Sequence, residues 1–507
     1  MRSSFEKGFS YGCCRLALFT KNSSNSLILC DYDINKTRNL LSTFALSKLR
    51  FTNYRYMAKV MRIKKGLSLN LKGKAPEERL RPLSPSSTYA VVPDDYPGLL
   101  PKLMVREGDR VLAGSPLMYH KGAEELVFTS PVSGEVLSIN RGAKRKILSI
   151  EIKPDATIEY APFDISRAAN LPADQLRNLL LSSGMWSLLR QRPFDRIADL
   201  RQTPRDIFVT AHFTAPLAPR CAYMLAGREA ELQAGLSALA KLTQGKVYVA
   251  VEPGAFPNLK EVERVEVSGP HPAGLCGTLI NKIAPVNKGE MVWTLKATDA
   301  AVIGRFLLTG KTDFSRPVAL TGSDAAQHGY TELLPGCRVR EVFADALCVR
   351  KEHERVICGD VLTGRKLDDS NPFFPQGCDQ ITVIPEGDDV NEFFGWATPG
   401  FGKLSHSRSF FSWMSPKSRE YVVDARVKGG ERAMIMSNEY DKVFALNILP
   451  EYLLKAIIAF DIPKMEDLGI YEVASEDFAL CEFVDTSKIE IQHIVRQGLD
   501  LLYKEIN

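Results

Sequence analysis

Few side chains in this 507-residue sequence combine a reactive type with the spacing that a catalytic or cofactor site requires. The ten cysteines include no C-x-x-C pair, which argues against an iron–sulfur cluster and against a zinc site. Lys403 follows a glycine-rich run that begins at Gly395, but it comes two residues too late for a phosphate-binding loop, and no strand-to-helix frame surrounds it. We therefore predict no catalytic residue and no metal site in this chain.

A binding site for an apolar ligand remains as a hypothesis. Such a site needs an apolar cleft with one or two hydrogen-bonding groups. The candidate residues lie in a loop rich in proline and glycine and in a second loop that contains a histidine: Tyr96, Leu99, Leu100, Leu103 and His271. The alternative is structural: the first loop closes the end of a β-barrel, and His271 only holds its own loop in place.

The segment that follows the first loop is rich in β-structure. From Val105 to Ile152, short β-branched runs alternate with turns of Gly, Pro or Asp, as in a small antiparallel barrel or sandwich. The order of these runs resembles the barrel-sandwich hybrid of biotinyl and lipoyl carrier domains. Carrier domains present a modified lysine at a hairpin tip, where this chain has Lys121 without a Met-Lys-Met or Asp-Lys-Ala context. We expect a solvated, unmodified Lys121 and a carrier fold kept for packing; attachment at Lys121 is the alternative.

Length, composition and charge bound the class of protein. The chain is long enough for three or four domains, and 45% hydrophobic with 25% charged residues is typical of a globular protein. No apolar run approaches the roughly 18–20 residues that a membrane-spanning helix needs. Residues 1–56 hold nine Lys/Arg and three acidic residues, whereas the remainder is nearly neutral, so nucleic-acid binding is not indicated. Scattered cysteines are typical of a reducing cytoplasm.

Five regions follow from the pattern along the chain, and the predicted fold class is α/β with additional β modules. Residues 1–56 are an Arg- and Ser-rich leader, either a transit peptide or upstream sequence translated in error before Met57, and we expect disorder in both cases. Residues 57–160 form the barrel-sandwich hybrid. Residues 161–322 predict a Rossmann-like parallel sheet covered by helices. Residues 323–400 predict a β-grasp-like module, and residues 401–507 predict coil followed by a helical C-terminus.

Within these regions the hydrophobic periodicity predicts individual elements. The predicted helices span residues 171–181, 228–242, 299–309 and 489–503, and the predicted strands span residues 206–211, 246–251, 290–295 and 316–321.

Six motifs stand in order along the chain: SPVSGEVLSINRGAKR from Ser130, SGMWSLLRQRPF from Ser183, GPHPAGLCGT from Gly269, FFGWATPG from Phe393, SRSF from Ser407 and EDFALCEFV from Glu476. Together they resemble the A subunit of the Na⁺-translocating NADH:quinone reductase. The resemblance covers the chain from Met61 onward, and the leading residues 1–56 have no counterpart.

That family is similar to the NADH- and FMN-binding subunit of respiratory complex I and to its homologue in the Rnf complex. Those relatives carry a glycine-rich loop whose backbone amides approach the phosphates of flavin and nucleotide. At the matching positions this chain has large side chains: Trp186, Arg190, Arg192 and Phe194. The resemblance thus implies a vestigial nucleotide loop whose side chains fill the cleft. The cysteine motif that ligates a cluster in such subunits is also missing.

The resemblance implies that the whole complex oxidises NADH, reduces quinone (ubiquinone or menaquinone) and exports Na⁺, with FAD, FMN, riboflavin and a 2Fe-2S centre on other subunits. This chain is then a peripheral subunit on the cytoplasmic face of the bacterial inner membrane, held there by the other five subunits. It is expected to carry no redox cofactor and to contribute to quinone binding. One alternative is a pure scaffold without a ligand, and the other is a stand-alone NADH–flavin dehydrogenase similar to its complex I counterpart.

Overall fold

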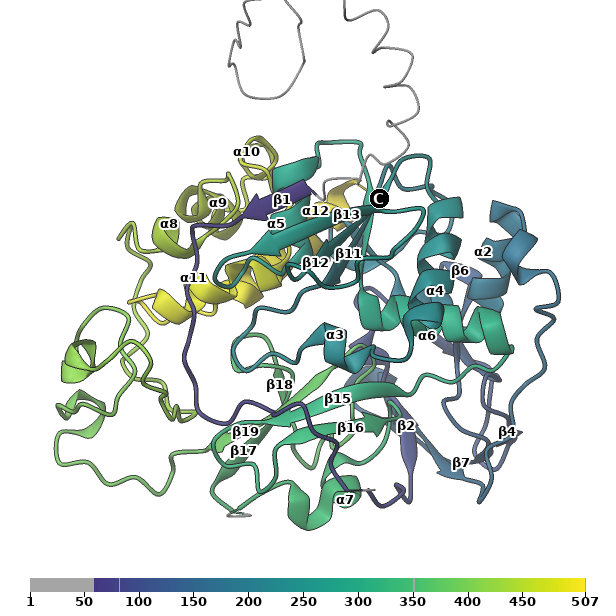
Figure 1. The fold of residues 1–507 in the computed structure, drawn as a ribbon, viewed down its shortest axis with the longest axis horizontal. Helices are drawn as coiled ribbons and strands as arrows, with labels where there is room; N and C mark the ends of the chain where they lie inside the picture. Colours follow the sequence, from purple (N-terminus) through teal and green to yellow (C-terminus); the bar gives the residue numbers. More distant parts are fainter. Residues whose placement is uncertain (1–58, 82, 350–351, 507) are drawn as a thin grey trace, which may run out of the picture. The chain divides into compact units, whose positions relative to one another are not determined.

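Figure 1 shows the chain in a computed structural model that describes residues 59–81, 83–349 and 352–506. The predicted leader, residues 1–56, lies outside the described residues. Four sheets organise the described part of the chain, with seven, five, four and three strands. No helix in that part is long and apolar enough to span a membrane.

The four- and three-stranded sheets form the predicted β-rich region. Their strand orders are β2 (Tyr89–Val91), β8 (Ile147–Pro154), β7 (Gly134–Arg141), β4 (Arg110–Val111) and β3 (Pro101–Leu103), β5 (Pro116–His120), β6 (Ala123–Thr129). Val136, Ile150 and Ile152 are fully buried because alternate residues of a strand share one face. Lys121 is exposed in the turn between β5 and β6, at the predicted hairpin tip.

The seven-stranded sheet has the order β1 (Lys59–Arg62), β13 (Glu263–Ser268), β12 (Val247–Val251), β11 (Ile207–Ala211), β14 (Val292–Lys296), β9 (Arg190–Arg192), β10 (Arg196–Ile197). From β1 to β14 all neighbours are parallel, which confirms the predicted parallel sheet. β1 pairs with β13 in this sheet, so its predicted place with the barrel-sandwich strands is wrong. The sheet partner of a strand is set by distant residues, which its own sequence does not reveal.

Helices cover both faces of this sheet (Figure 1). Val209 on β11 packs in one core with α4 (Glu229–Lys241) and α6 (Ala297–Thr309), whereas Phe208 packs in the other with α5 (Cys276–Ile283) and α12 (Ile491–Ile506). Glycines let α4 and α6 approach closely, because a Cβ at Gly304 would lie 1.7 Å from the backbone oxygen of Glu231.

The five-stranded sheet has the order β16 (Gly329–Leu333), β15 (Arg316–Thr321), β19 (Gln380–Pro385), β17 (Glu354–Cys358), β18 (Arg365–Lys366). β15 and β19 are parallel, and the other neighbours are antiparallel. The predicted place of β15 in the sheet of residues 161–322 is therefore wrong. Its buried apolar run suits either sheet, and its pairing with β16 and β19 decides between them.

The C-terminal region is coil followed by helices, as predicted. Between β19 and Tyr440 the described structure has two short 3₁₀ turns, η8 (Gly395–Ala397) and η9 (Phe411–Met414). The helices that follow are α8 (Tyr440–Val443), α9 (Pro450–Ile458), α10 (Ile462–Asp467), α11 (Ala479–Val484) and α12. The remaining helices are α2 (Ala173–Ser182), α3 (Cys221–Met224) and α7 (Val339–Phe343), with 3₁₀ turns η3 (Pro93–Asp95), η4 (Ala143–Arg145), η5 (Ala168–Asn170), η6 (Met185–Leu188), η7 (Ala344–Ala346) and η10 (Ser475–Phe478).

Candidate functional site

A cleft of about 470 Å³, termed the large cleft, opens at the carboxyl ends of β11 and β14. The chain leaves β11 toward β12 and β13 on one side, and β14 lies on the other side, so the strand order reverses between β11 and β14. In parallel α/β sheets, ligands bind in the crevice at such a reversal. Thr210 and Thr294 line the cleft from these strands, and residues 358–360, 363–364 and 376–380 line it from the five-stranded region.

His271 lines the large cleft and is only 4% exposed. The hydroxyl of Thr214 accepts a hydrogen bond from the backbone nitrogen of Gly274 at 2.9 Å and lies 3.2 Å from His271 Nδ1. When that hydroxyl donates to Nδ1, the ring proton stays on Nε2. Burial lowers the pKa of His271, so the imidazole is neutral near pH 7. His271 can therefore offer a neutral N–H donor to a ligand.

A charge network that is buried except at Lys296 borders the large cleft, and Lys296, Asp299 and Asp379 line it. Lys296 Nζ lies 3.0 Å from Asp379 Oδ2, and Arg316 Nη2 lies 2.8 Å from Asp299 Oδ1. Burial alone would lower the pKa of Lys296, but Asp379 and Asp299 raise it above its ordinary value. Arg316 is fully buried and also lies 3.6 Å from Asp379 Oδ1, so the network ties α6 to the five-stranded sheet.

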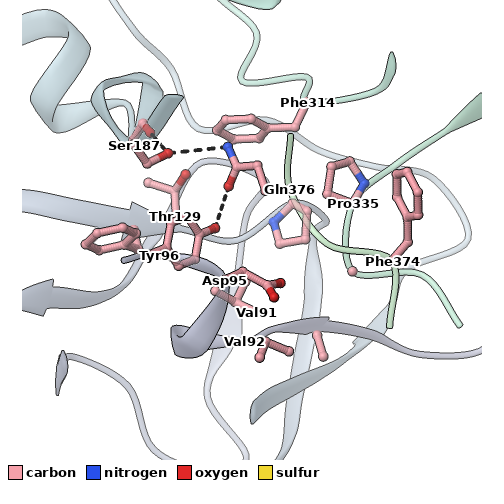
Figure 2. A pocket seen from close by; sticks show the side chains of 15 residues that line it. Val91, Val92, Asp95, Tyr96, Thr129, Ser187, Phe314, Pro335, Phe374 and Gln376 are labelled. Atoms are coloured by element: carbon pink, nitrogen blue, oxygen red, sulfur yellow. Dashed lines mark hydrogen bonds between the residues drawn. The ribbon is translucent and has the colours of Figure 1, made fainter. Parts of the chain in front are cut away.

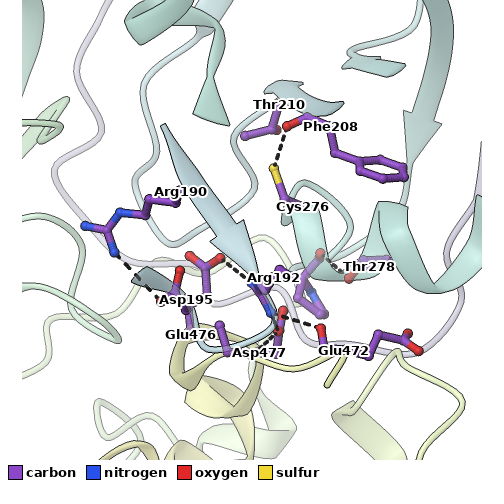
Figure 3. A network of polar contacts seen from close by, with 12 residues as sticks. Arg190, Arg192, Asp195, Phe208, Thr210, Cys276, Thr278, Glu472, Glu476 and Asp477 are labelled. Carbon is purple, nitrogen blue, oxygen red and sulfur yellow. Dashed lines mark hydrogen bonds and ion pairs between the residues drawn. The ribbon is translucent and has the colours of Figure 1, made fainter. Parts of the chain in front are cut away.

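Arg192, at the end of β9, links the seven-stranded sheet to the C-terminal helical region through hydrogen bonds and ion pairs (Figure 3). Its Nη1 donates to Asp477 Oδ2 at 2.7 Å and to the backbone oxygen of Glu472 at 3.1 Å, and its Nη2 donates to Glu476 Oε1 at 3.1 Å. Arg192 and Asp477 are both buried. Glu476 lines the large cleft with a side chain that is 43% exposed, and partial desolvation of its carboxyl raises its pKa to about 7 against the opposing effect of Arg192.

The four positions that we expected to fill a nucleotide cleft have different environments. Trp186 is fully buried, packs edge-on against Trp293 at 5.0 Å and donates its Nε1 hydrogen to the backbone oxygen of Ala198. Phe194 packs against Tyr503 at 5.2 Å. Of the four, Arg190 alone lines the large cleft. Trp186, Arg192 and Phe194 are buried in packed interior, and the expectation that these side chains fill a former nucleotide cleft stays a prediction.

The loop that contains Tyr96 borders a different and much smaller cavity of about 20 Å³ (Figure 2), termed the small cavity. The hydroxyl of Tyr96 donates to Gln376 Oε1, and its ring packs edge-on against Phe128 at 4.6 Å. Asp95 also lines this cavity, and burial raises its pKa to about 6 despite Arg365. A cavity of this volume accommodates about one water molecule.

The five predicted ligand residues are not brought to one place. Tyr96 lines the small cavity and His271 the large cleft, whereas Leu99 and Leu103 pack against the core and Leu100 is 61% exposed. Gln376 lines both spaces, and its Nε2 also donates to Ser187 Oγ at 3.3 Å.

Gln376 and Lys296 are candidate residues that the sequence analysis missed. Lys296 had a usable signal, since it directly follows the strand predicted at residues 290–295, and ligand residues gather at the carboxyl ends of parallel strands. Gln376 gave no such signal, because its position between the two cavities depends on contacts with distant parts of the chain.

Comparison with known proteins identifies the domains of this chain. Residues 61–155 match the "NqrA N-terminal barrel-sandwich hybrid domain", residues 171–312 the "NqrA second alpha/beta domain" and residues 317–369 the "NQRA C-terminal domain". A solved chain of an NAD⁺-reducing [NiFe]-hydrogenase covers 45% of this chain and 52% of its own length, with 12% identity and a TM-score of 0.31, which establishes no shared fold.

Curated relatives match over nearly their whole length. The A subunit of the Na⁺-translocating NADH-quinone reductase of Rhodopirellula baltica is 36% identical over 88% of this chain and 98% of its own. Proteins with the same name from Serratia proteamaculans, at 36% identity, and from Neisseria meningitidis serogroup A, at 35%, each match 88% of this chain and 100% of their own. The chain therefore belongs to the NqrA family, the A subunits of the Na⁺-translocating NADH-quinone reductase.

Proposed function

We propose that this chain is a peripheral subunit, on the cytoplasmic face of the bacterial inner membrane, of a complex that couples NADH oxidation and quinone reduction to Na⁺ export. Its own share is assembly of the complex and binding of the quinone, ubiquinone or menaquinone. Family membership supports the place in the complex. The large cleft with His271 supports the quinone site.

The large cleft suits a quinone head group in volume and chemistry. Its volume of about 470 Å³ falls within the roughly 300–1,000 Å³ of typical ligand pockets. Phe213, Ala218 and Pro219 supply apolar lining, and the neutral His271 supplies a donor for one quinone carbonyl. Tyr96 holds Gln376 at the edge of the cleft and acts as a positioning residue. Leu99, Leu100 and Leu103 line neither space, and the proposed quinone site does not include them.

We also propose that the chain carries no redox cofactor, and that FAD, FMN, riboflavin and the 2Fe-2S centre reside on other subunits. Among the described residues, the one group of three close His, Cys, Asp or Glu side chains is His353 with Asp388 and Asp389, which includes no cysteine. The seven described cysteines are all buried and unpaired. These ligand sets do not suit an iron–sulfur cluster.

The strand orders support two finer fold proposals. In the seven-stranded sheet, β13, β12, β11 and β14 follow the 3-2-1-4 order of a Rossmann-like half. In the five-stranded sheet, β15 and β19 form a central parallel pair flanked by antiparallel strands, which suits a β-grasp-like module.

The test is a titration of the purified full-length chain with a short-chain quinone, combined with an absorbance spectrum of the same sample. Saturable binding by colourless protein is the expected result. Folded, colourless protein that binds no quinone would favour the scaffold alternative. A flavin spectrum in the purified protein would favour the NADH–flavin dehydrogenase alternative and contradict the absence of a cofactor.

A further inference from the structure

The coil between β19 and α8 displays apolar side chains that nothing in the described structure covers. Residues 390–436, termed the aromatic coil, hold about half of the exposed large apolar side chains among the described residues. These are Val390, Phe393, Phe394, Phe401, Phe411, Trp413, Met414, Val422, Val427, Ile435 and Met436. Single exposed apolar residues are ordinary, whereas a concentration of large ones marks an interaction surface.

The centre of the aromatic coil is held in place by contacts with the rest of the chain. Tyr421 pairs with Leu71, and its backbone exchanges hydrogen bonds with Asn70 and Lys72 at 2.8 and 2.9 Å. The Tyr421 hydroxyl donates to the backbone oxygen of Ser412, within η9, at 3.2 Å. Phe401 packs against Phe411 at 5.7 Å. These contacts hold the backbone around η9, which carries the exposed rings of Phe411 and Trp413, and this lowers the entropic cost of binding a partner there.

Positive charge accompanies these rings. Arg408, Lys417 and Arg419 are exposed, and none of them has an acidic partner within the described ranges, whereas Lys403 and Arg426 of the same coil both pair with Glu392. Exposed Phe, Trp, Met and Arg side chains are typical of the core of a protein–protein interface. The unpaired cations call for an acidic rim on the surface that meets them.

We propose that the aromatic coil docks this chain on another subunit of the reductase complex, through a partner face that is apolar and has an acidic rim. This inference rests on the proposed place in the complex. A lipid surface is a weaker match, because a uniformly anionic membrane repels the exposed carboxylates Glu420 and Glu431. A protein face can instead place its acidic groups opposite Arg408, Lys417 and Arg419 alone.

The test is assembly of the complex. The full-length chain is coexpressed with the remaining subunits, one of which carries an affinity tag, and the amount of this chain that co-purifies is measured. The variant F411S/W413S/M414S removes three exposed apolar side chains, and we expect roughly a tenfold or greater loss of the retained chain. The variant K417E/R419E tests the acidic rim. We expect less of this variant to co-purify with the tagged subunit, and low ionic strength should not restore the amount, because the new carboxylates repel the acidic rim of the partner.

The matched control is L137S/L148S, which removes two apolar side chains of similar exposure, 45% and 43%, from the barrel-sandwich region. The control should be retained like the wild type, and all variants should unfold at the wild-type temperature when tested as isolated chains. Retention of both coil variants at the wild-type level would overturn the proposal.

A second measurement separates the lipid alternative. The isolated chain is sedimented with vesicles of phosphatidylglycerol and phosphatidylethanolamine, with and without the other subunits. We expect no sedimentation with vesicles alone; sedimentation that F411S/W413S/M414S abolishes would overturn the proposal in favour of a membrane surface. Quinone binding by the isolated triple variant should equal that of the wild type, so loss of docking and loss of quinone binding are distinguished.

Discussion

The large cleft and the small cavity share Gln376 but differ in almost every other respect. The large cleft has about 470 Å³, lies at the carboxyl ends of parallel strands and contains a neutral buried histidine. The small cavity has about 20 Å³, lies beside the barrel-sandwich strands and contains Asp95 next to Tyr96. The apolar loop that contains Tyr96 therefore leaves too little room for a ligand beside it, whereas the reversal of strand order between β11 and β14 leaves a cleft that is large enough for one.

The difference also shows what holds each space open. The large cleft is bounded by three distant parts of the chain, which Arg192 and the Lys296–Asp379 pair hold together. The small cavity is closed by ring packing of Tyr96 and Phe128. Variants that act on one space should affect the other only through Gln376, which lines both.

Removal of the Arg192 guanidinium should have the largest effect. R192M leaves the buried carboxylate of Asp477 without its cation, and we expect a loss of about 3–5 kcal/mol in the free energy of unfolding. Denaturant titration measures it. The control R190M removes a half-exposed arginine 3.7 Å from Asp195 and should cost no more than about 1 kcal/mol. Equal free energies of unfolding for the two variants would contradict the role of Arg192 in holding the C-terminal region to the sheet.

The free energy of unfolding should depend on pH through one carboxyl group in each space, Asp95 in the small cavity and Glu476 in the large cleft. The folded-state pKa values of Asp95 and Glu476 are raised to about 6 and about 7, so each group stabilises the fold at low pH and loses that contribution as pH rises through its folded pKa. The free energy of unfolding of the wild type should decline by at most about 3 kcal/mol between about pH 4 and 6 because of Asp95, and D95N should remove this decline. E476Q should remove the part of the decline that extends up to about pH 7. Unfolding measured from pH 4 to 8 checks this. Variant profiles parallel to the wild type would contradict it.

The imidazole of His271 should matter for the ligand more than for the fold. H271L removes the neutral donor from the large cleft, and we expect roughly a tenfold weaker affinity for a short-chain quinone, the value of one hydrogen bond. T214V, which removes the hydroxyl next to Nδ1, should weaken binding less while leaving His271 in place. Unchanged affinity in H271L would place the quinone elsewhere.

Tyr96 should give the smallest effect. Y96F removes the hydrogen bond to Gln376 but keeps the ring packing against Phe128, so quinone affinity should fall by no more than about threefold. Isothermal titration of Y96F and H271L with the same quinone shows which variant loses more affinity. A greater loss of affinity in Y96F than in H271L would contradict His271 as the hydrogen-bond donor to the quinone.

The sequence predicted local elements well and long-range pairing poorly. The helix at 171–181, which ends ahead of Gly184 with φ +77°, and the amphipathic helix at 489–503 follow from periodicity and a left-handed glycine. The sheets to which β1 and β15 belong could not be predicted from the sequence, because the partner of a strand depends on residues that are distant in the chain.

The candidate site was predictable only in part. His271 was identified from its loop, and it does line the large cleft. Tyr96 was grouped with it because both suit an apolar ligand, yet the fold separates them into two cavities. Gln376, which lines both, has a role that only the folded chain reveals.

Locating the bound quinone tests the proposed site in the large cleft most directly. A photoreactive short-chain quinone is bound to the full-length chain, activated by light, and the labelled peptides are identified by mass spectrometry. A quinone site in the large cleft predicts label on peptides that line it, around His271 and residues 210–219, with less label in H271L. Label confined to the peptide that contains Tyr96 to Leu103 would contradict it.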